Sequence, residues 1–141
     1  MPAIRNATTV WEGTLFEGAG QVTLDSSHLG TYDVTWASRA EEPNGKTSPE
    51  ELIAAAHSSC FSMAFSNALA KNETPATKLT TTAAVELTPG TGITGITLTV
   101  RGEVPGLDND TFIELATAAK EGCPVSKALA GTTITLDAAL A

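Results

Sequence analysis

The sequence has few of the residues that would suit a negatively charged partner or a disulfide scaffold. Lysine and arginine number 8 against 16 aspartates and glutamates, so the net charge is -8. Nucleic acid and anionic bilayers are repelled by such a surface, and we expect neutral, apolar or cationic partners, no nucleic acid and no membrane. Only two cysteines occur in 141 residues. In a reducing compartment such a pair is seldom a structural crosslink, which leaves inert core residues or a working thiol pair.

The chain also lacks segments that direct proteins out of the cytoplasm. Its start, Met1 to Asn6, has no apolar secretion segment, no lipidation signal appears, and no later stretch qualifies as a membrane span. The longest apolar run lies within Thr47–Ala70, where His57 and several serines make the segment too polar for lipid. We therefore expect a cytoplasmic protein.

Thr47–Ala70 is the longest stretch that is compatible with a helix. Thr47 or Ser48 can accept hydrogen bonds from the first free N–H groups, and Pro49 suits the first turn. After Glu51 no charged residue follows until Lys71, so no face of this helix is built for water. We expect the helix to be buried on all sides, with self-association as one way to cover it.

The remaining pattern predicts an α+β fold of about six strands. Threonine- and valine-rich runs of period two indicate strands, and the glycines and prolines between them indicate turns. Two shorter helices are expected near residues 108–120 and 124–130, after a long antiparallel pair and before the last strand. No linker or repeat divides the chain, so we expect a single domain over residues 1–141. The expected strands are 9–16, 21–24, 31–36, 77–87, 93–104 and 132–140, with a loop at 37–46.

The two cysteines are the first candidates for chemistry. Cys60 lies in the middle of the long helix, where a cysteine is more often a silent core residue than a nucleophile. Cys123 precedes Pro124 at a predicted helix start, where free N–H groups favour a thiolate. Their separation along the chain means that only the fold can bring them together, and spacing alone leaves their pairing open.

His57 precedes Cys60 by three residues, so the two share one face of the helix. This spacing is compatible with a Cys–His pair for hydrolysis or with two ligands of a metal. A structural zinc site needs four ligands, however, and the only other candidates are Cys123 and the isolated His28. We favour His57 as a hydrogen-bonded core or pocket-wall residue, and we expect no metal.

Arg39 is one of three arginines and stands where the third predicted strand enters the loop before the long helix. Glu50 lies ten residues before Cys60, about 15 Å along a helix, so direct contact between this carboxylate and the thiol is not expected. Any link between them needs a long side chain such as that of Arg39.

Taken together, these motifs resemble the osmotically inducible protein C and organic hydroperoxide resistance family (OsmC/Ohr). The resemblance spans essentially the whole chain, and both cysteine motifs occur in the family's order and separation. Within the family the chain looks like the OsmC branch, because an arginine stands at Arg39 and none lies near the first hairpin. His57 and Val125 also match that branch. The segments that carry the resemblance are 11–13, 49–64 and 122–129.

The resemblance implies a cysteine-based peroxidase that reduces organic hydroperoxides and hydrogen peroxide during oxidative or osmotic stress. It implies an OsmC-like fold, with antiparallel sheets around the cysteine-bearing helix, in an intertwined homodimer. Cys60 would be the peroxidatic thiol that becomes a sulfenic acid, and Cys123 would resolve it as a disulfide. An external dithiol, of the lipoyl type or a small thiol, would restore the pair without a bound cofactor.

Physical reasoning then assigns roles to the accessory residues. A mid-helix thiol in apolar surroundings has a raised pKa, so Cys60 needs a nearby cation. Arg39 can bind the thiolate and the peroxide oxygens through its charge and its N–H donors, while Glu50 pairs with the guanidinium and orients it. Candidates for an apolar wall around the peroxide are Leu52, Ile53, Phe61, Met63 and Phe65. The alternatives are a non-catalytic redox or metal-binding protein and a Cys–His hydrolase.

Overall fold

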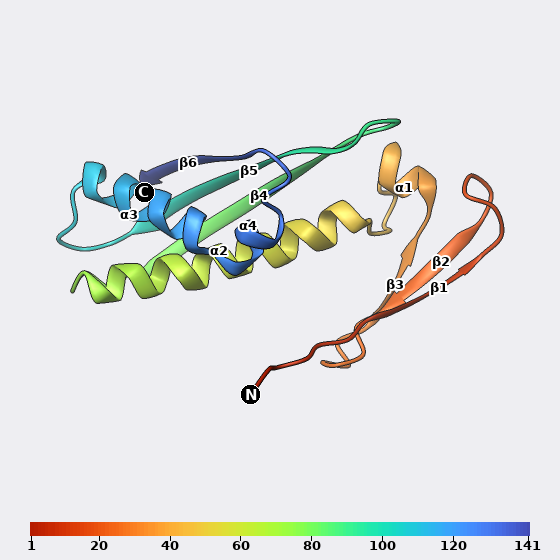
Figure 1. The fold of residues 1–141 in the computed structure, drawn as a ribbon, viewed down its shortest axis with the longest axis horizontal. Helices are drawn as coiled ribbons and strands as arrows, with labels where there is room; N and C mark the ends of the chain where they lie inside the picture. Colours follow the sequence, from red (N-terminus) through yellow and green to blue (C-terminus); the bar gives the residue numbers. More distant parts are fainter. The chain divides into compact units, whose positions relative to one another are not determined.

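The computed structural model describes residues 1–141 and divides them into two compact units, residues 1–52 and 53–141. The first holds a small antiparallel sheet and a short helix, and the second holds a larger sheet with three helical segments (Figure 1). The α+β class predicted from the sequence is confirmed. None of the helices is both long and apolar enough to span a lipid bilayer.

The first sheet is a meander of three strands, β1 (Thr8–Glu12), β2 (Ala19–Thr23) and β3 (Thr31–Val34), in the order β1-β2-β3. Both pairs are antiparallel, so the predicted hairpin and third strand are confirmed. Gly20 pairs with both Trp11 and Val34 at the centre of this sheet. A Cβ there would lie 2.7 Å from the Trp11 ring, so only glycine leaves room for the indole.

A short helix, α1 (Trp36–Ala40), occupies positions that the sequence pattern assigned to a strand end and a loop. That prediction was wrong, because Thr35 and Ser38 form a capping box. The Thr35 hydroxyl accepts from the Ser38 N–H at 3.0 Å, and the Ser38 hydroxyl accepts from the Thr35 N–H at 3.0 Å. This box starts a helical turn directly after β3 and places Arg39 in its last turn.

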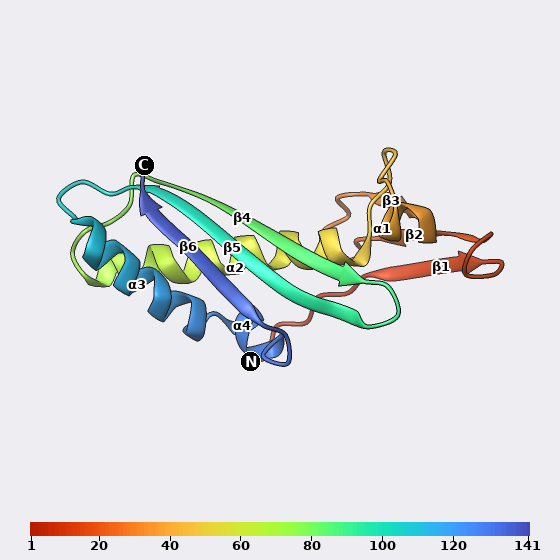
Figure 2. The same cartoon turned by 90° about the horizontal axis from the view of Figure 1, so that it is seen from above.

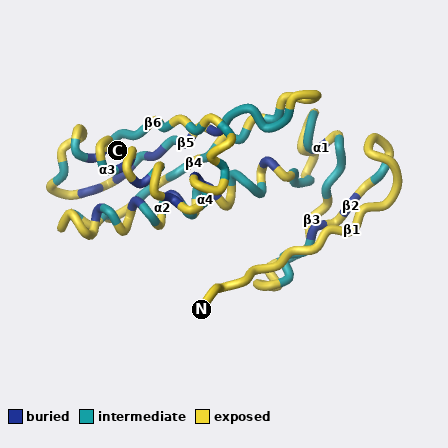
Figure 3. The backbone as a smooth tube through the Cα atoms, in the orientation of Figure 1, coloured by how far each residue is buried: buried dark blue, intermediate teal, exposed yellow.

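The long helix α2 covers Pro49–Lys71, as predicted. The Ser48 hydroxyl accepts from the Glu51 N–H at 3.1 Å, which satisfies one of the free donors of the first turn. His57, Phe61, Phe65 and Leu69 recur every four residues and are buried. Exposed positions recur along the opposite face (Figure 3), and Met63 among them is 71% exposed. The expectation of burial on all sides is therefore wrong for the single chain, since its sheet and helices cover only one face of α2.

The second sheet contains β4 (Lys78–Thr88), β5 (Gly92–Glu103) and β6 (Ile134–Leu140), in the order β4-β5-β6 (Figure 2). β4 and β5 form the predicted antiparallel pair. β6 instead runs parallel to β5, with Ile96 opposite Ile134, so the description as purely antiparallel sheets does not hold at this edge. The cause is the connection: two helices lie between β5 and β6, and such a crossover returns the chain in the same direction.

These two helices are α3 (Asn109–Gly122) and α4 (Pro124–Ala128). Asp108 caps α3 by accepting from the Thr111 N–H at 2.9 Å, and Pro124 stands at the first position of α4, as predicted. The core of this unit joins α2, β5 and α3, and Phe65 meets Phe112 edge to face at 4.9 Å between ring centroids. Cys123 lies buried at the edge of this core, between α3 and α4.

Candidate functional site

The two cysteines meet inside the second unit. Cys60 is half-buried on α2, Cys123 is fully buried at the junction of α3 and α4, and their sulfur atoms are 3.1 Å apart. The backbone places Cys123 there, because its N–H donates to the Ala119 carbonyl at 2.9 Å and its extended conformation separates the two helices. Both thiols are free. At this distance a disulfide can form with a small movement of either side chain.

The two thiols differ in electrostatic surroundings. Burial raises the pKa of Cys60, and the adjacent Cys123 raises it further, while the Val125 N–H opposes this shift only in part. Burial also disfavours the Cys123 thiolate, but the Ser126 N–H, the Cys60 thiol, the Ser126 hydroxyl and the Val125 N–H together lower the pKa of Cys123. Both directions agree with the expectation for a mid-helix cysteine and for a cysteine at a helix start.

His57 is fully buried and is hydrogen-bonded to a residue that the sequence did not single out. Its Nε2 lies 2.7 Å from the Ser126 hydroxyl, and its Nδ1 is buried without a partner. Burial lowers the pKa of His57, which favours the neutral ring. No hydrogen bond joins His57 to Cys60, so the geometry does not support a Cys–His dyad. The predicted core role of His57 is confirmed. The four-residue spacing of His57 with the buried Phe61 and Phe65 on α2 agrees with this role.

The structure brings no three histidine, cysteine, aspartate or glutamate side chains together as a group that could hold a metal ion.

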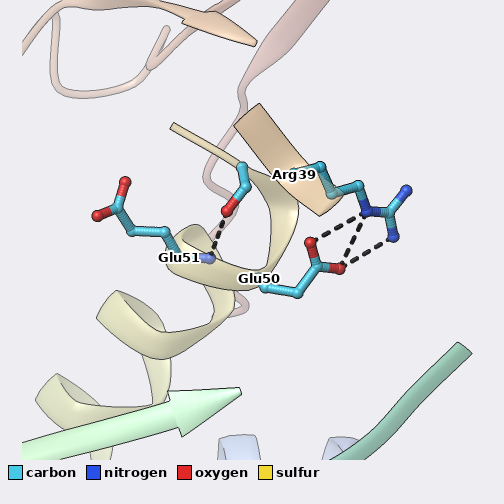
Figure 4. Close-up of polar contacts among 4 residues, drawn as sticks. Arg39, Glu50 and Glu51 are labelled. Atoms are coloured by element: carbon cyan, nitrogen blue, oxygen red, sulfur yellow. Dashed lines mark hydrogen bonds and ion pairs between the residues drawn. The ribbon is translucent and has the colours of Figure 1, made fainter. Parts of the chain in front are cut away.

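Arg39 and Glu50 form the second cluster of predicted site residues, within the first unit. Arg39 Nε donates to Glu50 Oε1 and Oε2 at 3.0 and 3.2 Å, and Nη2 donates to Oε2 at 2.9 Å (Figure 4). The Glu50 side chain is 9% exposed and that of Arg39 is 32% exposed. Such a fork fixes the guanidinium plane and leaves Nη1 free of the carboxylate. The contact between Glu50 and Arg39 that the sequence analysis expected is therefore present.

An apolar cavity of 560 Å³ lies beside Arg39 in the first unit. The Trp36 ring packs against the guanidinium, with 5.9 Å between Arg39 Cζ and the ring centroid. The sequence analysis did not connect Trp11 or Trp36 with this cavity. Their aromatic side chains were the feature of the sequence that could have indicated a role in lining a cavity. The cavity is lined by Thr9, Trp11, Leu15, Val22, Val34, Thr35, Trp36, Arg39, Pro49 and Leu52.

Of the five candidates for an apolar wall, Leu52 alone lines this cavity. Phe61 and Phe65 are fully buried in the core of the second unit, whereas Met63 is exposed on α2. Apolar character along a helix could not separate these cases, because core and cavity walls use the same residue types.

Comparison with known proteins gives one consistent result. The sequence model of the family described as OsmC-like protein matches residues 42–137. The chain is 43% identical over 130 residues to the peroxiredoxin OsmC of Escherichia coli strain K12, which covers 90% of each chain. Among solved structures it resembles an OsmC organic hydroperoxide resistance protein of Legionella pneumophila, at 24% identity, 99% coverage of both chains and a TM-score of 0.73.

A second solved structure is similar as well. The organic hydroperoxide resistance protein OhrB of Bacillus subtilis aligns at 26% identity and a TM-score of 0.69, over 96% of this chain and 98% of its own. The fold predicted from the cysteine motifs is thus confirmed by two structural relatives.

Proposed function

The chain belongs to the OsmC-like protein family, and on that premise we propose that it is a thiol-dependent peroxidase that reduces organic hydroperoxides and hydrogen peroxide. Its products are an alcohol or water, and its role is defence against oxidative or osmotic stress. The observation that supports the proposal most directly is the 3.1 Å distance between the sulfur atoms of Cys60 and Cys123.

In the first step the Cys60 thiolate attacks the terminal oxygen of the hydroperoxide. The O–O bond breaks, the alcohol leaves with a proton, and Cys60 becomes a sulfenic acid. In the second step Cys123 attacks the Cys60 sulfur, the S–O bond breaks, and water leaves as the disulfide forms. An external dithiol then reduces the disulfide, becoming a disulfide itself, and no bound cofactor takes part. A lipoyl-type dithiol or a small thiol has the required chemistry.

Arg39 is the cation in this proposal. Burial disfavours the Cys60 thiolate, so a permanent positive charge is needed to make it available near neutral pH. The guanidinium keeps its charge at any physiological pH and can hold both the thiolate and the peroxide oxygens. Glu50, which binds it through three hydrogen bonds, sets its orientation. The apolar cavity beside Arg39 suits the alkyl or aryl part of an organic hydroperoxide.

We further propose that the protein acts as a homodimer in the cytoplasm, with residues 1–141 as one domain. The exposed face of α2, uncharged between Glu51 and Lys71, supports the dimer. Large apolar side chains exposed in the first unit, such as Phe16 and Leu29 at 75% each, support it as well. The reducing cytoplasm suits a thiol pair that must return to the reduced state. Light scattering after size exclusion tests the dimer, and a monomeric mass at micromolar concentration would contradict it.

The central experiment treats the reduced protein with one equivalent of cumene hydroperoxide. We expect peptide mass spectrometry to show a Cys60–Cys123 disulfide, and steady turnover of the peroxide when dithiothreitol is present. Peroxide consumption no faster than in buffer would overturn the proposed function. Formation of the disulfide without steady turnover would instead show that dithiothreitol is the wrong reductant for this protein.

A further inference from the structure

The structure pairs α2 with α4 through two contacts of the same spacing. His57 and Cys60 are three residues apart on α2, and Ser126 on α4 lies three residues after Cys123, the N-cap residue of that helix. Cys60 meets Cys123 at 3.1 Å, and His57 meets Ser126 at 2.7 Å. His57 and Cys60 share one face of α2, so the buried His57–Ser126 bond and the contact between the two sulfurs hold the same part of α2 against the start of α4.

The direction of this hydrogen bond depends on the tautomer of His57. His57 is fully buried, and its Nδ1 has no partner. Nδ1 is unpaired in either tautomer, and the tautomer that frees the Ser126 proton carries the ring proton on Nε2 and donates it to the Ser126 oxygen. The Ser126 hydroxyl makes no other hydrogen bond, and its own proton is therefore free to be donated. Cys123 lies three residues before Ser126, at the N-cap of α4.

We propose that His57 and Ser126 are positioning residues for disulfide formation, in which His57 Nε2–H holds the Ser126 hydroxyl and the hydroxyl donates to the Cys123 sulfur. This inference rests on the proposed peroxidase function. The assisted step joins the Cys123 sulfur to the Cys60 sulfur, breaks the S–O bond of the sulfenic acid, and releases hydroxide, which takes up a proton to become water. Neither His57 nor Ser126 is consumed or oxidised.

The electrostatics of Cys123 support this arrangement. The Ser126 hydroxyl is among the groups that lower the pKa of Cys123 against the effect of burial. On α2, Cys60 and His57 are the titratable groups that face this end of α4. On neighbouring positions, Glu121 and Lys127 are exposed, and Lys120 Nζ donates to a carbonyl of β6 at 3.3 Å. The hydroxyl is thus a local source of stabilisation for the thiolate beside the backbone N–H groups of α4.

The test follows the sulfenic acid of Cys60 in a single turnover, with dimedone trapping and intact-protein mass as readouts. Ser126→Ala removes the hydroxyl, and Ser126→Thr retains it. His57→Leu removes the donor, and His57→Gln retains an N–H at the position of Nε2. Ser62→Ala is the matched control, because its hydroxyl bonds Thr81 at 2.7 Å on the same unit without contacting either sulfur.

Loss of one hydrogen bond to a thiolate corresponds to about tenfold in rate and about one unit in the midpoint of a pH profile. We expect Ser126→Ala and His57→Leu to slow disulfide formation by about tenfold and to move its pH midpoint upward. The rate of sulfenic acid formation should stay the same. Ser126→Thr, His57→Gln and Ser62→Ala should behave as the wild type does. Wild-type rates and pH profiles in both Ser126→Ala and His57→Leu would overturn the proposal.

A second measurement is independent of peroxide chemistry. In a Cys60→Ser background the only thiol is Cys123, and thiolate absorbance near ~240 nm reports its ionisation directly. Adding Ser126→Ala should raise the titration midpoint by about one unit, while adding Ser62→Ala should leave it in place. An unchanged midpoint in Ser126→Ala would contradict the assignment even if the wild type reduces peroxides. A shifted midpoint in a protein that does not consume peroxide would refute the peroxidase function alone.

Discussion

The sulfur atoms of Cys60 and Cys123 lie 3.1 Å apart, one half-buried on a long helix and the other enclosed at the start of a short one. The short helix stabilises the thiolate of Cys123, whereas burial works against that of Cys60. The pair is therefore asymmetric before any substrate arrives. For Cys60 to attack a peroxide from this position, a positive charge from outside its own helix must stabilise its thiolate.

The first prediction separates the roles of the two cysteines. Cys60→Ser should abolish the consumption of cumene hydroperoxide, because no other thiol is placed to attack the peroxide. Cys123→Ser should still react once but should leave a sulfenic acid that dimedone traps, since the resolving thiol is missing. Each variant is the control for the other. Dimedone labelling of Cys123 in Cys60→Ser would reverse the assignment.

The second prediction concerns Arg39 and Glu50. Arg39→Ala should slow sulfenic acid formation by about a hundredfold, the scale expected when one preorganised charge is lost from a reacting centre. Arg39→Lys keeps the charge but loses the fork and should recover only part of the rate. Circular dichroism should show folded protein in both variants. A wild-type rate in Arg39→Ala would show that the thiolate depends on another group.

Glu50→Gln is expected to act through Arg39 alone. It keeps the size of the side chain but removes the charge that holds the guanidinium through bonds of 2.9 to 3.2 Å. We expect about a tenfold slower first step, with little further loss when Arg39→Ala is added, since both changes disable the same guanidinium. Stopped-flow rates of the two single variants and the double variant check this. If the rate loss of the double variant equals the product of the losses of the two single variants, Glu50 acts independently of Arg39.

The pH dependence of the first step follows from the raised pKa of Cys60. Its thiolate forms at higher pH than an ordinary thiol with pKa 9.0 unless a cation compensates. Removing Arg39 should therefore move the pH midpoint of sulfenic acid formation upward, so that the variant regains rate only in alkaline solution. The measurement is the single-turnover rate across pH in Cys123→Ser, with and without Arg39→Ala. An unchanged pH midpoint in the Arg39→Ala variant would show that Arg39 is not the compensating charge.

A stability prediction tests the packing that supports Cys123. Gly102 on β5 faces α3, where an added Cβ would lie 2.6 Å from the Phe112 ring. Gly102→Ala should lower the free energy of unfolding by about 1–3 kcal/mol, the usual cost of overpacking a core. Gly95→Ala on the same strand meets nothing closer than 3.9 Å and serves as the control. Urea unfolding of both variants measures the difference, and equal midpoints would contradict the packing described for α3.

Much of the fold could be predicted from periodicity and turn residues. The bounds of α2 followed from Ser48 and Pro49 at its start, and the β4–β5 pair followed from two alternating runs around a glycine turn. The failures have local or topological causes. The helix α1 depends on a hydroxyl contact between Thr35 and Ser38 that hydrophobic periodicity does not register. The parallel direction of β6 depends on how its crossover packs.

The candidate site divides in the same way. The sequence by itself determined the candidate residues for the proposed chemistry: two cysteines in different electrostatic settings, an arginine before α2 and a glutamate in its first turn. Only the tertiary structure decided that Cys123 faces Cys60, that His57 bonds Ser126, and that one face of α2 is left exposed. The physical reason is that charge, polarity and helix position are local properties. Contacts between residues 63 or 69 positions apart depend on how the crossover through α3 and α4 packs against α2.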